Sequence, residues 1–249
     1  MEADFIAAIQ ELIKETARDE SANLRLAAEI VAKALDQDRL IHLFGTGHSR
    51  LLAEEGFFRA GGLACINPVV IHELSLLMDP LLATAAERDV TVAARVFTRY
   101  RISPGDVMIV FSNSGVNAVP VEVARGARLL GAHVIAVASR RYMSQASSNH
   151  PDGLKLGDLA DVLIDNHGVP GDAVLQIPGL PTRVGPASTI VGALILHAVL
   201  AGAVSRSVAR GIAPPVYMSS KLPGADEHNA AIAARYRHRV AALEPTARG

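Results

Sequence analysis

Short apolar runs alternate along this chain with stretches in which apolar side chains recur at helical spacing. The apolar runs are rich in β-branched residues and predict strands at 39–45, 63–71, 106–111, 133–138 and 161–164. The run at 63–71 is interrupted by Asn67 and Pro68. The helical spacing predicts further elements at 49–60, 84–100 and 116–130, from about 185 onward, and in a last helix that ends near 243.

Strands that are apolar on both faces and alternate with helices are typical of a parallel sheet covered on both sides. Right-handed crossovers then give an α/β fold in three layers, a doubly wound (flavodoxin-like) parallel sheet of about five strands. We expect one domain over 1–249, consisting of an N-terminal helical segment, an α/β core, and a C-terminal tail with a helix, at 1–37, 38–210 and 211–249. Ligands of such folds bind beyond the carboxyl ends of the strands.

The N-terminal segment has helical spacing over residues 3–36. One continuous helix of this length is about 50 Å long, roughly the width of a domain of this size. The helix therefore either breaks near 19–21 or projects and packs on another subunit. We favour packing on a partner, which predicts a homodimer or homotetramer.

Composition narrows the possible partners. The formal net charge is -1 and the basic residues are scattered, so we expect no nucleic acid partner. The apolar segment 190–204 contains His197 and is shorter than the roughly 20 residues that cross a bilayer. It predicts a buried helix and no membrane contact. The acidic N-terminus lacks the order of a signal peptide, so a cytoplasmic location is expected.

Cysteine usage and one long loop add two smaller expectations. Cys65 is the only cysteine, which excludes an intrachain disulfide, and its apolar surroundings predict a buried thiol. Residues 165–184 are rich in glycine and proline, and loops of that length inside a compact domain are usually functional or disordered.

A first candidate phosphate loop lies between the strand at 39–45 and the helix after it. Glycines allow the backbone to approach an anion, and the start of a helix offers unpaired N–H groups. The polar or glycine positions that we expect to line it are Gly45, Gly47, His48 and Ser49. A dinucleotide fingerprint is disfavoured because Arg50 occupies its last glycine position, and the chain lacks the Gly-Lys-Ser/Thr of a Walker loop.

A second candidate loop follows the strand at 106–111. Two serines, two asparagines and a glycine supply more donors than helix capping requires. These positions are Ser112, Asn113, Ser114, Gly115 and Asn117. Hydroxyls at the start of a later helix, Ser188 among them, are a further candidate contact.

The two loops resemble the signature loops of the SIS (sugar isomerase) domain family, with GTGHS at 45–49 and SNSG at 112–115. Within that family the chain looks most similar to the branch related to phosphoheptose isomerase. The resemblance covers about residues 30–210. It implies a phosphorylated sugar as ligand and phosphate contacts from Ser49, Ser112, Ser114 and Asn117, in a protein that commonly dimerises.

Proton transfer requires carboxylates or histidines near the ligand. The candidates on or near the expected ligand edge are Glu55, His72, Glu73 and His228. Each also has a purely structural interpretation, such as an ion pair between Glu55 and Arg59 four residues on.

The pattern departs from phosphoheptose isomerases at two positions. Those proteins have a glutamate ten residues after the loop serine and a histidine six residues after it, whereas this chain has Arg59 and Glu55 there. Arg59 becomes a candidate for binding an acidic group of the substrate. We expect no metal, because no His-Glu-x-x-His or comparable ligand spacing occurs, and no other cofactor.

The sequence therefore predicts an isomerase of aldose–ketose or amino-sugar phosphates that acts by carboxylate or histidine proton transfer. Two alternatives stay open: a phosphosugar lyase or etherase, and a phosphosugar-binding regulator without catalysis.

Overall fold

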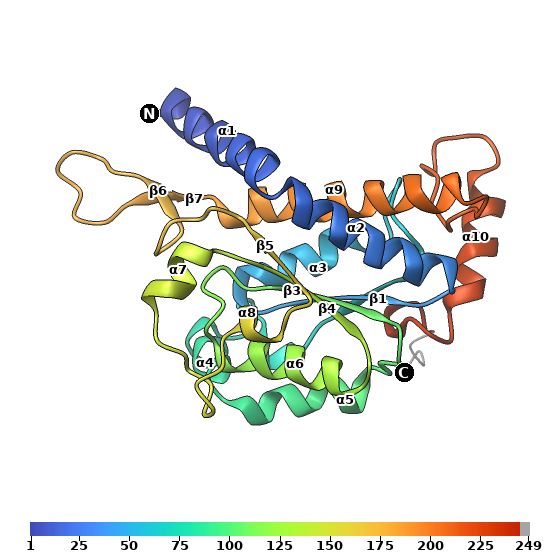
Figure 1. Cartoon of the computed structure of the whole chain (residues 1–249), viewed down its shortest axis with the longest axis horizontal. Coiled ribbons are helices and arrows are strands. Elements are labelled where there is room, and N and C mark those ends of the chain that lie inside the picture. Colours follow the sequence, from blue (N-terminus) through green and yellow to red (C-terminus); the bar gives the residue numbers. More distant parts are fainter. Residues whose placement is uncertain (245–249) are drawn as a thin grey trace.

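The computed structural model describes residues 1–244 and contains a five-stranded parallel sheet in the order β2-β1-β3-β4-β5 (Figure 1). The strands are β1 (Ile41–Gly45), β2 (Ile66–Val69), β3 (Val107–Phe111), β4 (His133–Ala138) and β5 (Val162–Asp165). Their order reverses next to β1, as in a doubly wound sheet. The predicted α/β class, strand number and parallel direction are confirmed.

Helices cover both faces of the sheet (Figure 1). One face packs against α1 (Glu2–Asp19), α2 (Ser21–Asp36), α3 (Arg50–Gly56) and α9 (Ser188–Ala209). The other side carries α4 (Pro80–Ala86), α5 (Ala94–Arg99), α6 (Ala118–Leu129) and α8 (Leu156–Leu159), while α7 (Arg140–Gln145) follows the carboxyl end of β4. Successive residues of one strand enter different cores: Ile109 packs with α2 and α9, whereas Val110 packs with α5 and α6.

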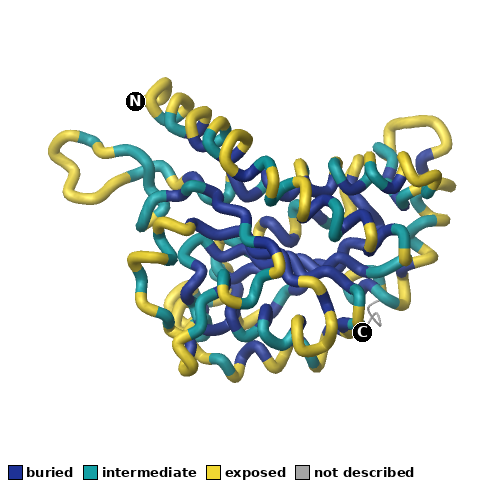
Figure 2. Tube along the Cα trace, viewed as in Figure 1, coloured by how far each residue is buried: buried dark blue, intermediate teal, exposed yellow. Residues whose placement is uncertain are grey.

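The N-terminal helical segment breaks at Glu20, within the range predicted from the sequence. Helix α2 packs along α9, but α1 extends past the sheet and is largely exposed (Figures 1 and 2). In α1 the only buried side chains are Ile9, Leu12 and Thr16. The break and the projection predicted as alternatives therefore both occur.

The glycine-rich segment at 165–184 contains structure that the sequence pattern did not reveal. Strands β6 (Ala173–Leu175) and β7 (Val184–Pro186) form an antiparallel hairpin whose tip is exposed (Figure 2). The hairpin lies beside α1, where a Cβ added to Gly185 would meet the Phe5 ring at 2.8 Å.

Two element boundaries predicted from the sequence are wrong. Asn67 and Pro68 do not interrupt β2, because β2 is an edge strand and pairs only with β1, so the missing N–H of proline is tolerated. The helix expected at 84–100 is divided into the end of α4, a 3-10 turn at Val90–Ala93, and α5. The division falls at Asp89, whose side chain accepts a hydrogen bond from the Thr91 N–H and starts a new turn.

Helix α9 is long and apolar enough to span a bilayer by length and composition alone. In the structure one side of it is buried against α2 and α3, including Val191, Ile195 and Val199. A core helix of a soluble protein passes the same test.

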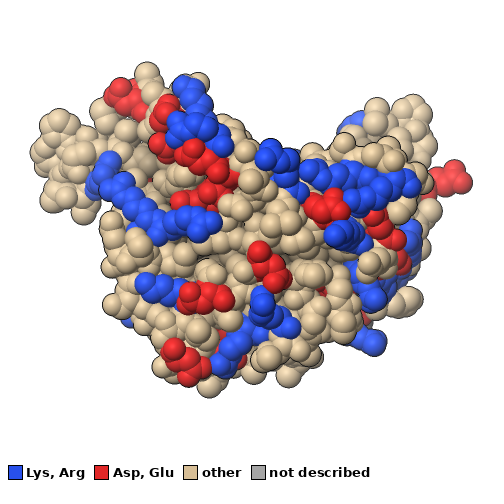
Figure 3. Space-filling model, viewed as in Figure 1, with Lys and Arg blue, Asp and Glu red and all other residues tan. Residues whose placement is uncertain are grey.

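On the face that includes α1 and α2, basic and acidic side chains are interspersed (Figure 3). Cys65 is buried, as expected, and burial raises the pKa of its thiol to about 12.

The C-terminal segment packs at the amino ends of the strands. Helix α10 (Ala225–Tyr236) is followed by a 3-10 turn at Ala241–Leu243, so the last helix ends earlier than predicted. The Tyr236 hydroxyl donates a hydrogen bond to Asp38 Oδ1 at 2.7 Å, and Arg239 pairs with the same carboxylate. These contacts fix the segment next to the entry of β1.

Candidate functional site

The first candidate phosphate loop is a 3-10 turn, Gly47–Ser49, between β1 and α3. The chain folds back so tightly that a Cβ on Gly45 would lie 2.4 Å from the Ser49 carbonyl oxygen. Gly47 has a φ of +54°, which other residues rarely adopt. Ser49 is half-buried and His48 is exposed. The glycines are therefore required by the shape of the loop, and the loop leaves the two polar side chains accessible.

Hydrogen bonds within the second candidate loop and to the neighbouring loops fix its shape. Ser112 Oγ accepts a hydrogen bond from the Gly115 N–H at 3.3 Å. Asn113 Oδ1 accepts one from Asn166 Nδ2 at 3.0 Å, and the Asn113 carbonyl accepts one from the Ser139 N–H. Ser114 is half-buried, and no side-chain hydrogen bond in the described chain uses it. The loop is thus rigidly supported while Ser114 stays available to a ligand.

The two loops share one edge of the sheet because β1 and β3 are neighbours, with Gly45 opposite Phe111 at their carboxyl ends. This is the edge at which open α/β sheets bind ligands. The structure therefore brings together the two loops that the sequence singled out.

A carboxylate that sequence analysis missed lies between the two loops. Glu87, at the end of α4, accepts a hydrogen bond from Asn117 Nδ2 at 2.5 Å and hydrogen-bonds to the Thr46 hydroxyl. A Cβ on Gly47 would lie 2.9 Å from its Oε1. Burial raises the pKa of Glu87, against the lowering effect of these hydrogen bonds. Asn117, expected to contact a phosphate, is therefore engaged with Glu87 in this structure.

Farther along α3, three polar side chains converge on the outer face of the domain. Glu55 Oε1 lies 3.1 Å from His197 Nε2, and Glu55 also forms an ion pair with Arg59. Arg59 Nη1 lies 3.4 Å from the same imidazole nitrogen. Desolvation, and then the charge of Arg59, lower the pKa of His197, so its imidazole is neutral at neutral pH. A carboxylate beside a neutral imidazole is a pair suited to proton transfer.

His197 was also not predicted as a site residue from the sequence, where it only interrupts the apolar segment. The available signal was a lone imidazole on a helix that is otherwise apolar. His197 lies close to Glu55 because α3 packs on α9, although the two residues are 142 positions apart in the chain. Spacing along the chain carries no information about that contact.

Within residues 1–244, no hydrogen bond or ion pair joins the other three expected catalytic residues to this pair, and two of the three have other partners. Glu73 forms an ion pair with Arg95, and His72 beside it is exposed. His228 Nε2 lies 2.9 Å from the Val216 carbonyl oxygen, on the helix that packs at the amino ends of the strands. Within one chain, His228 is thus at the opposite edge of the sheet from Ser49.

Ser188 stands at the start of α9 and is held by a carboxylate from the hairpin. Asp172 accepts hydrogen bonds from the Ser188 N–H and the Ser188 hydroxyl, both at 2.8 Å, and from the Ala187 N–H at 3.2 Å. Asp172 therefore acts as a capping residue from outside the helix. In this structure the Ser188 hydroxyl is used within the chain.

Comparisons with known proteins agree with this fold and with the loops. The SIS domain family matches residues 4–139. A UPF0309 protein of Geobacillus thermodenitrificans is 38% identical over 239 residues, which is 96% of each chain. A UPF0309 protein of Listeria innocua is 40% identical over 232 residues, 93% of this chain and 94% of that one. The chain belongs to the SIS domain family, and the resemblance drawn from the two loops is confirmed.

Two solved structures that match the chain do so at low sequence identity. A phosphoheptose isomerase from Francisella tularensis is 16% identical and has a TM-score of 0.50, over 81% of this chain and 95% of that chain. The Vibrio vulnificus NanR protein complexed with ManNAc-6P is 16% identical with a TM-score of 0.49, over 94% of this chain and 67% of that one. The Francisella structure shares the fold, and at this identity the likeness extends no further.

Proposed function

We propose that this protein isomerises a phosphorylated sugar, with the phosphate on the two loops and proton transfer at Glu55 and His197. The observation that carries the proposal is the position of this pair. Glu55 lies six residues after Ser49, on the helix that starts at the first phosphate loop, which is about 9 Å along a helix axis. A sugar with its phosphate on Ser49 and Ser114 can reach the pair with the opposite end of its carbon chain.

The chemistry needs one base and one route for the hydroxyl proton. A base removes the proton from the carbon next to the carbonyl, an enediol forms, and the proton is returned to the neighbouring carbon. The neutral imidazole of His197 and the carboxylate of Glu55 can each accept a proton, and Arg59 supplies a positive charge beside the developing oxyanion. This replaces Glu73, His72 and His228 as the residues that we assign to the reaction.

The same region supports the expectation of a homodimer. The outer side of α9 is apolar, and Ile190, Val208 and the half-buried Leu194 lie on it. A helix that is apolar all round is normally buried on all sides. A groove of about 370 Å³ on this side is lined by His197, Ala201 and Val204. A second copy seated there would cover the apolar surface and border the proton-transfer pair.

The experiment has a binding arm and a turnover arm. Thermal shift against hexose, heptose and amino-sugar phosphates, with the free sugars alongside, identifies ligands that bind the native state. We expect phosphorylated sugars alone to raise the melting temperature, and the double variant Ser112→Ala/Ser114→Ala to abolish the rise. Ser147→Ala, an exposed serine on another loop, is the matched control.

The best binder is then tested for aldose–ketose interconversion. We expect Glu55→Gln and His197→Gln each to lower turnover at least 100-fold, while Glu54→Gln, which changes the exposed neighbour, leaves it unchanged. Full turnover in both Glu55→Gln and His197→Gln would exclude the proposed pair. Binding without turnover in the wild-type protein would support the regulator alternative instead.

A further inference from the structure

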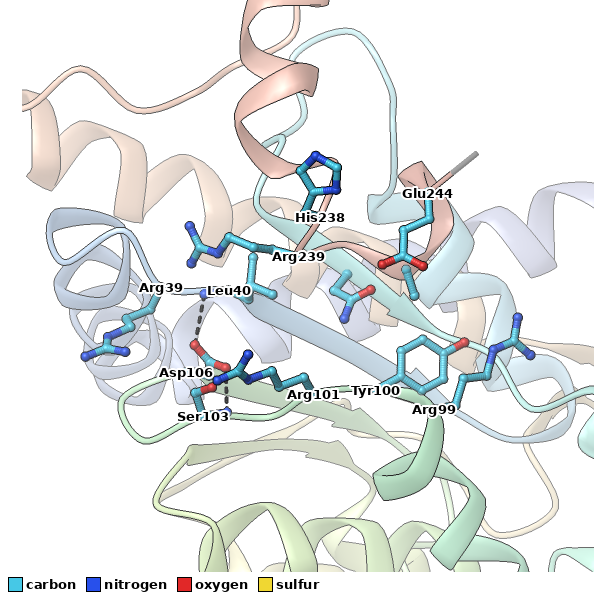
Figure 4. Close-up of a pocket in the computed structure, with 12 residues that line it drawn as sticks. Arg39, Leu40, Arg99, Tyr100, Arg101, Ser103, Asp106, His238, Arg239 and Glu244 are labelled. Carbon is cyan, nitrogen blue, oxygen red and sulfur yellow. Dashed lines mark hydrogen bonds between the residues drawn. The ribbon is translucent and has the colours of Figure 1, made fainter. Parts of the chain in front are cut away.

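A second cavity lies at the opposite edge of the sheet, among the amino ends of the strands (Figure 4). It measures about 370 Å³, within the range of small-molecule sites. Figure 4 shows it between the segment from Arg99 to Ser103 on one side and the C-terminal turn with His238, Arg239 and Glu244 on the other. None of the phosphate-loop residues lines this cavity.

The lining of the cavity is strongly basic. Two carboxylates line it, those of Asp106 and Glu244. Four arginines line it as well: Arg39, Arg99, Arg101 and Arg239. Arg239 is neutralised by Asp38. Within residues 1–244, the other three have no carboxylate at ion-pair distance, and the buried Nε of Arg39 has no hydrogen-bond partner. Uncompensated guanidinium groups around a cavity fit a phosphate group, which they can bind through paired N–H donors.

The carboxylate of Asp106 does not offset this charge toward a ligand, because its oxygens are already occupied. Asp106 accepts hydrogen bonds from the Leu40 N–H at 3.1 Å and the Ser103 N–H at 2.8 Å. His42 Nε2 lies 3.2 Å from its Oδ2. Burial raises the pKa of Asp106, but these hydrogen bonds outweigh it and hold the pKa below its ordinary value.

A buried amide oxygen adds a second requirement on the ligand. His42 Nε2 lies 3.2 Å from Asp106 Oδ2, and His42 Nδ1 lies 3.1 Å from Asn67 Nδ2, an arrangement that suits a tautomer donating to Asp106 and accepting from Asn67. In this arrangement the nitrogen of the Asn67 amide faces His42, and its oxygen does not. Asn67 is 1% exposed and lines the cavity, and its Oδ1 has no partner in the described chain. A buried carbonyl oxygen of this kind needs a donor, which a hydroxyl group provides.

We propose that this cavity is a second ligand site, which binds a phosphate monoester carrying free hydroxyls. The phosphate is held by Arg39 and Arg101, and a hydroxyl of the ligand donates to Asn67 Oδ1. Sugar phosphates and nucleoside monophosphates share this chemistry. The site is independent of the phosphate loops, since it lies at the other end of β1 and β3.

Isothermal titration with ribose 5-phosphate, adenosine monophosphate and inorganic phosphate tests the site. The proteins compared are the wild type, the loop variant Ser112→Ala/Ser114→Ala, and the loop variant that also carries Arg39→Ala/Arg101→Ala. Arg25→Ala is the matched control, because Arg25 is exposed on α2 away from both sites. Circular dichroism melting verifies that each variant is folded.

We expect the loop variant and Arg25→Ala to bind at least one of the two esters. Adding Arg39→Ala/Arg101→Ala to the loop variant should weaken that binding at least tenfold, and adding Asn67→Ser should weaken binding of the ester but not of inorganic phosphate. The site is refuted if neither ester binds the loop variant, or if the loop variant with Arg39→Ala/Arg101→Ala binds the ester as tightly as the loop variant alone. Equal affinity for inorganic phosphate and both esters would overturn the role given to Asn67.

Discussion

Asn117 donates a hydrogen bond of 2.5 Å to Glu87 at the point where the two candidate phosphate loops meet. The carboxylate occupies donors that would otherwise be available to a phosphate. Glu87 thus links the segments that follow β1 and β3. A bound phosphate has to compete with a negative charge already in place, which makes Glu87 the most informative single position to change.

Glu87→Gln is expected to stabilise the protein in a pH-dependent way. The pKa of Glu87 is higher in the folded chain than its ordinary value of 4.5, because of burial. Its contribution to stability is therefore fully present below pH 4.5 and is lost as the pH rises through the folded-state pKa. At pH 7.5 the variant should melt about 2–4 °C higher, for roughly 1 kcal/mol.

The increase in melting temperature of Glu87→Gln should disappear at pH 4, where the Glu87 carboxyl is protonated in both the folded and the unfolded chain. Differential scanning fluorimetry over pH 4–8 measures it, with the exposed Glu54→Gln as control. A constant difference across this range would contradict the assignment of burial as the cause.

The pH dependence of turnover should report on His197. Burial, and then Arg59, lower its pKa, so the neutral base persists at pH values where an ordinary histidine is protonated. The acid limb of the kcat/KM profile is expected below pH 6.5. Arg59→Gln removes one of the two causes and should move the limb to higher pH, whatever it does to the absolute rate. An acid limb that stays in place in Arg59→Gln would assign the titration to another group.

Gly47→Ala should be destabilising for two separable reasons. The φ of +54° costs roughly 1–2 kcal/mol for an L side chain, and the added Cβ would lie 2.9 Å from Glu87 Oε1. Gly171→Ala is a matched control, because Gly171 also has a positive φ but open space around its Cβ position. We expect Gly47→Ala to melt lower than Gly171→Ala and to lose sugar-phosphate binding. Equal melting temperatures would mean that the contact with Glu87 relaxes freely.

The proposed dimer is tested on the outer side of α9. Ala201→Glu places a charge in the middle of the apolar groove that includes His197. We expect it to shift the protein from dimer to monomer in analytical ultracentrifugation and to lower turnover with it. Leu129→Glu is the control, since Leu129 is 82% exposed on α6, across the sheet. Sedimentation of the wild-type protein as a monomer would exclude the proposed dimer.

The layer architecture and the placing of the two candidate loops at one end of the sheet were predictable from the sequence, because both depend on local patterns. The apolar strand at 107–111 and its serine-rich continuation are contiguous, so the sheet and the loop are visible together. The break at Glu20 was also predictable, as one of two options. Such features involve neighbours along the chain or the general geometry of parallel sheets.

The residues that the sequence missed are those whose role depends on distant packing. Glu87 reaches Asn117 across 30 positions, and His197 reaches Glu55 across 142. The hairpin at 173–186 was hidden for a different reason, since its strands of three residues are too short to show alternation. Glu73 and His228 were plausible by chemistry alone, and in this structure they contact Arg95 and the Val216 carbonyl oxygen.

The slender contact between α1 and the rest of the domain has a consequence for how the protein forms. An isolated helix of 18 residues is marginal in water, and α1 buries three of its side chains within its own chain. Within its own chain α1 also contacts the hairpin and α9, and in the proposed dimer another copy adds to this stabilisation. Helicity of the first 19 residues and subunit association would then be one equilibrium, and dilution would melt α1 while the sheet stays intact.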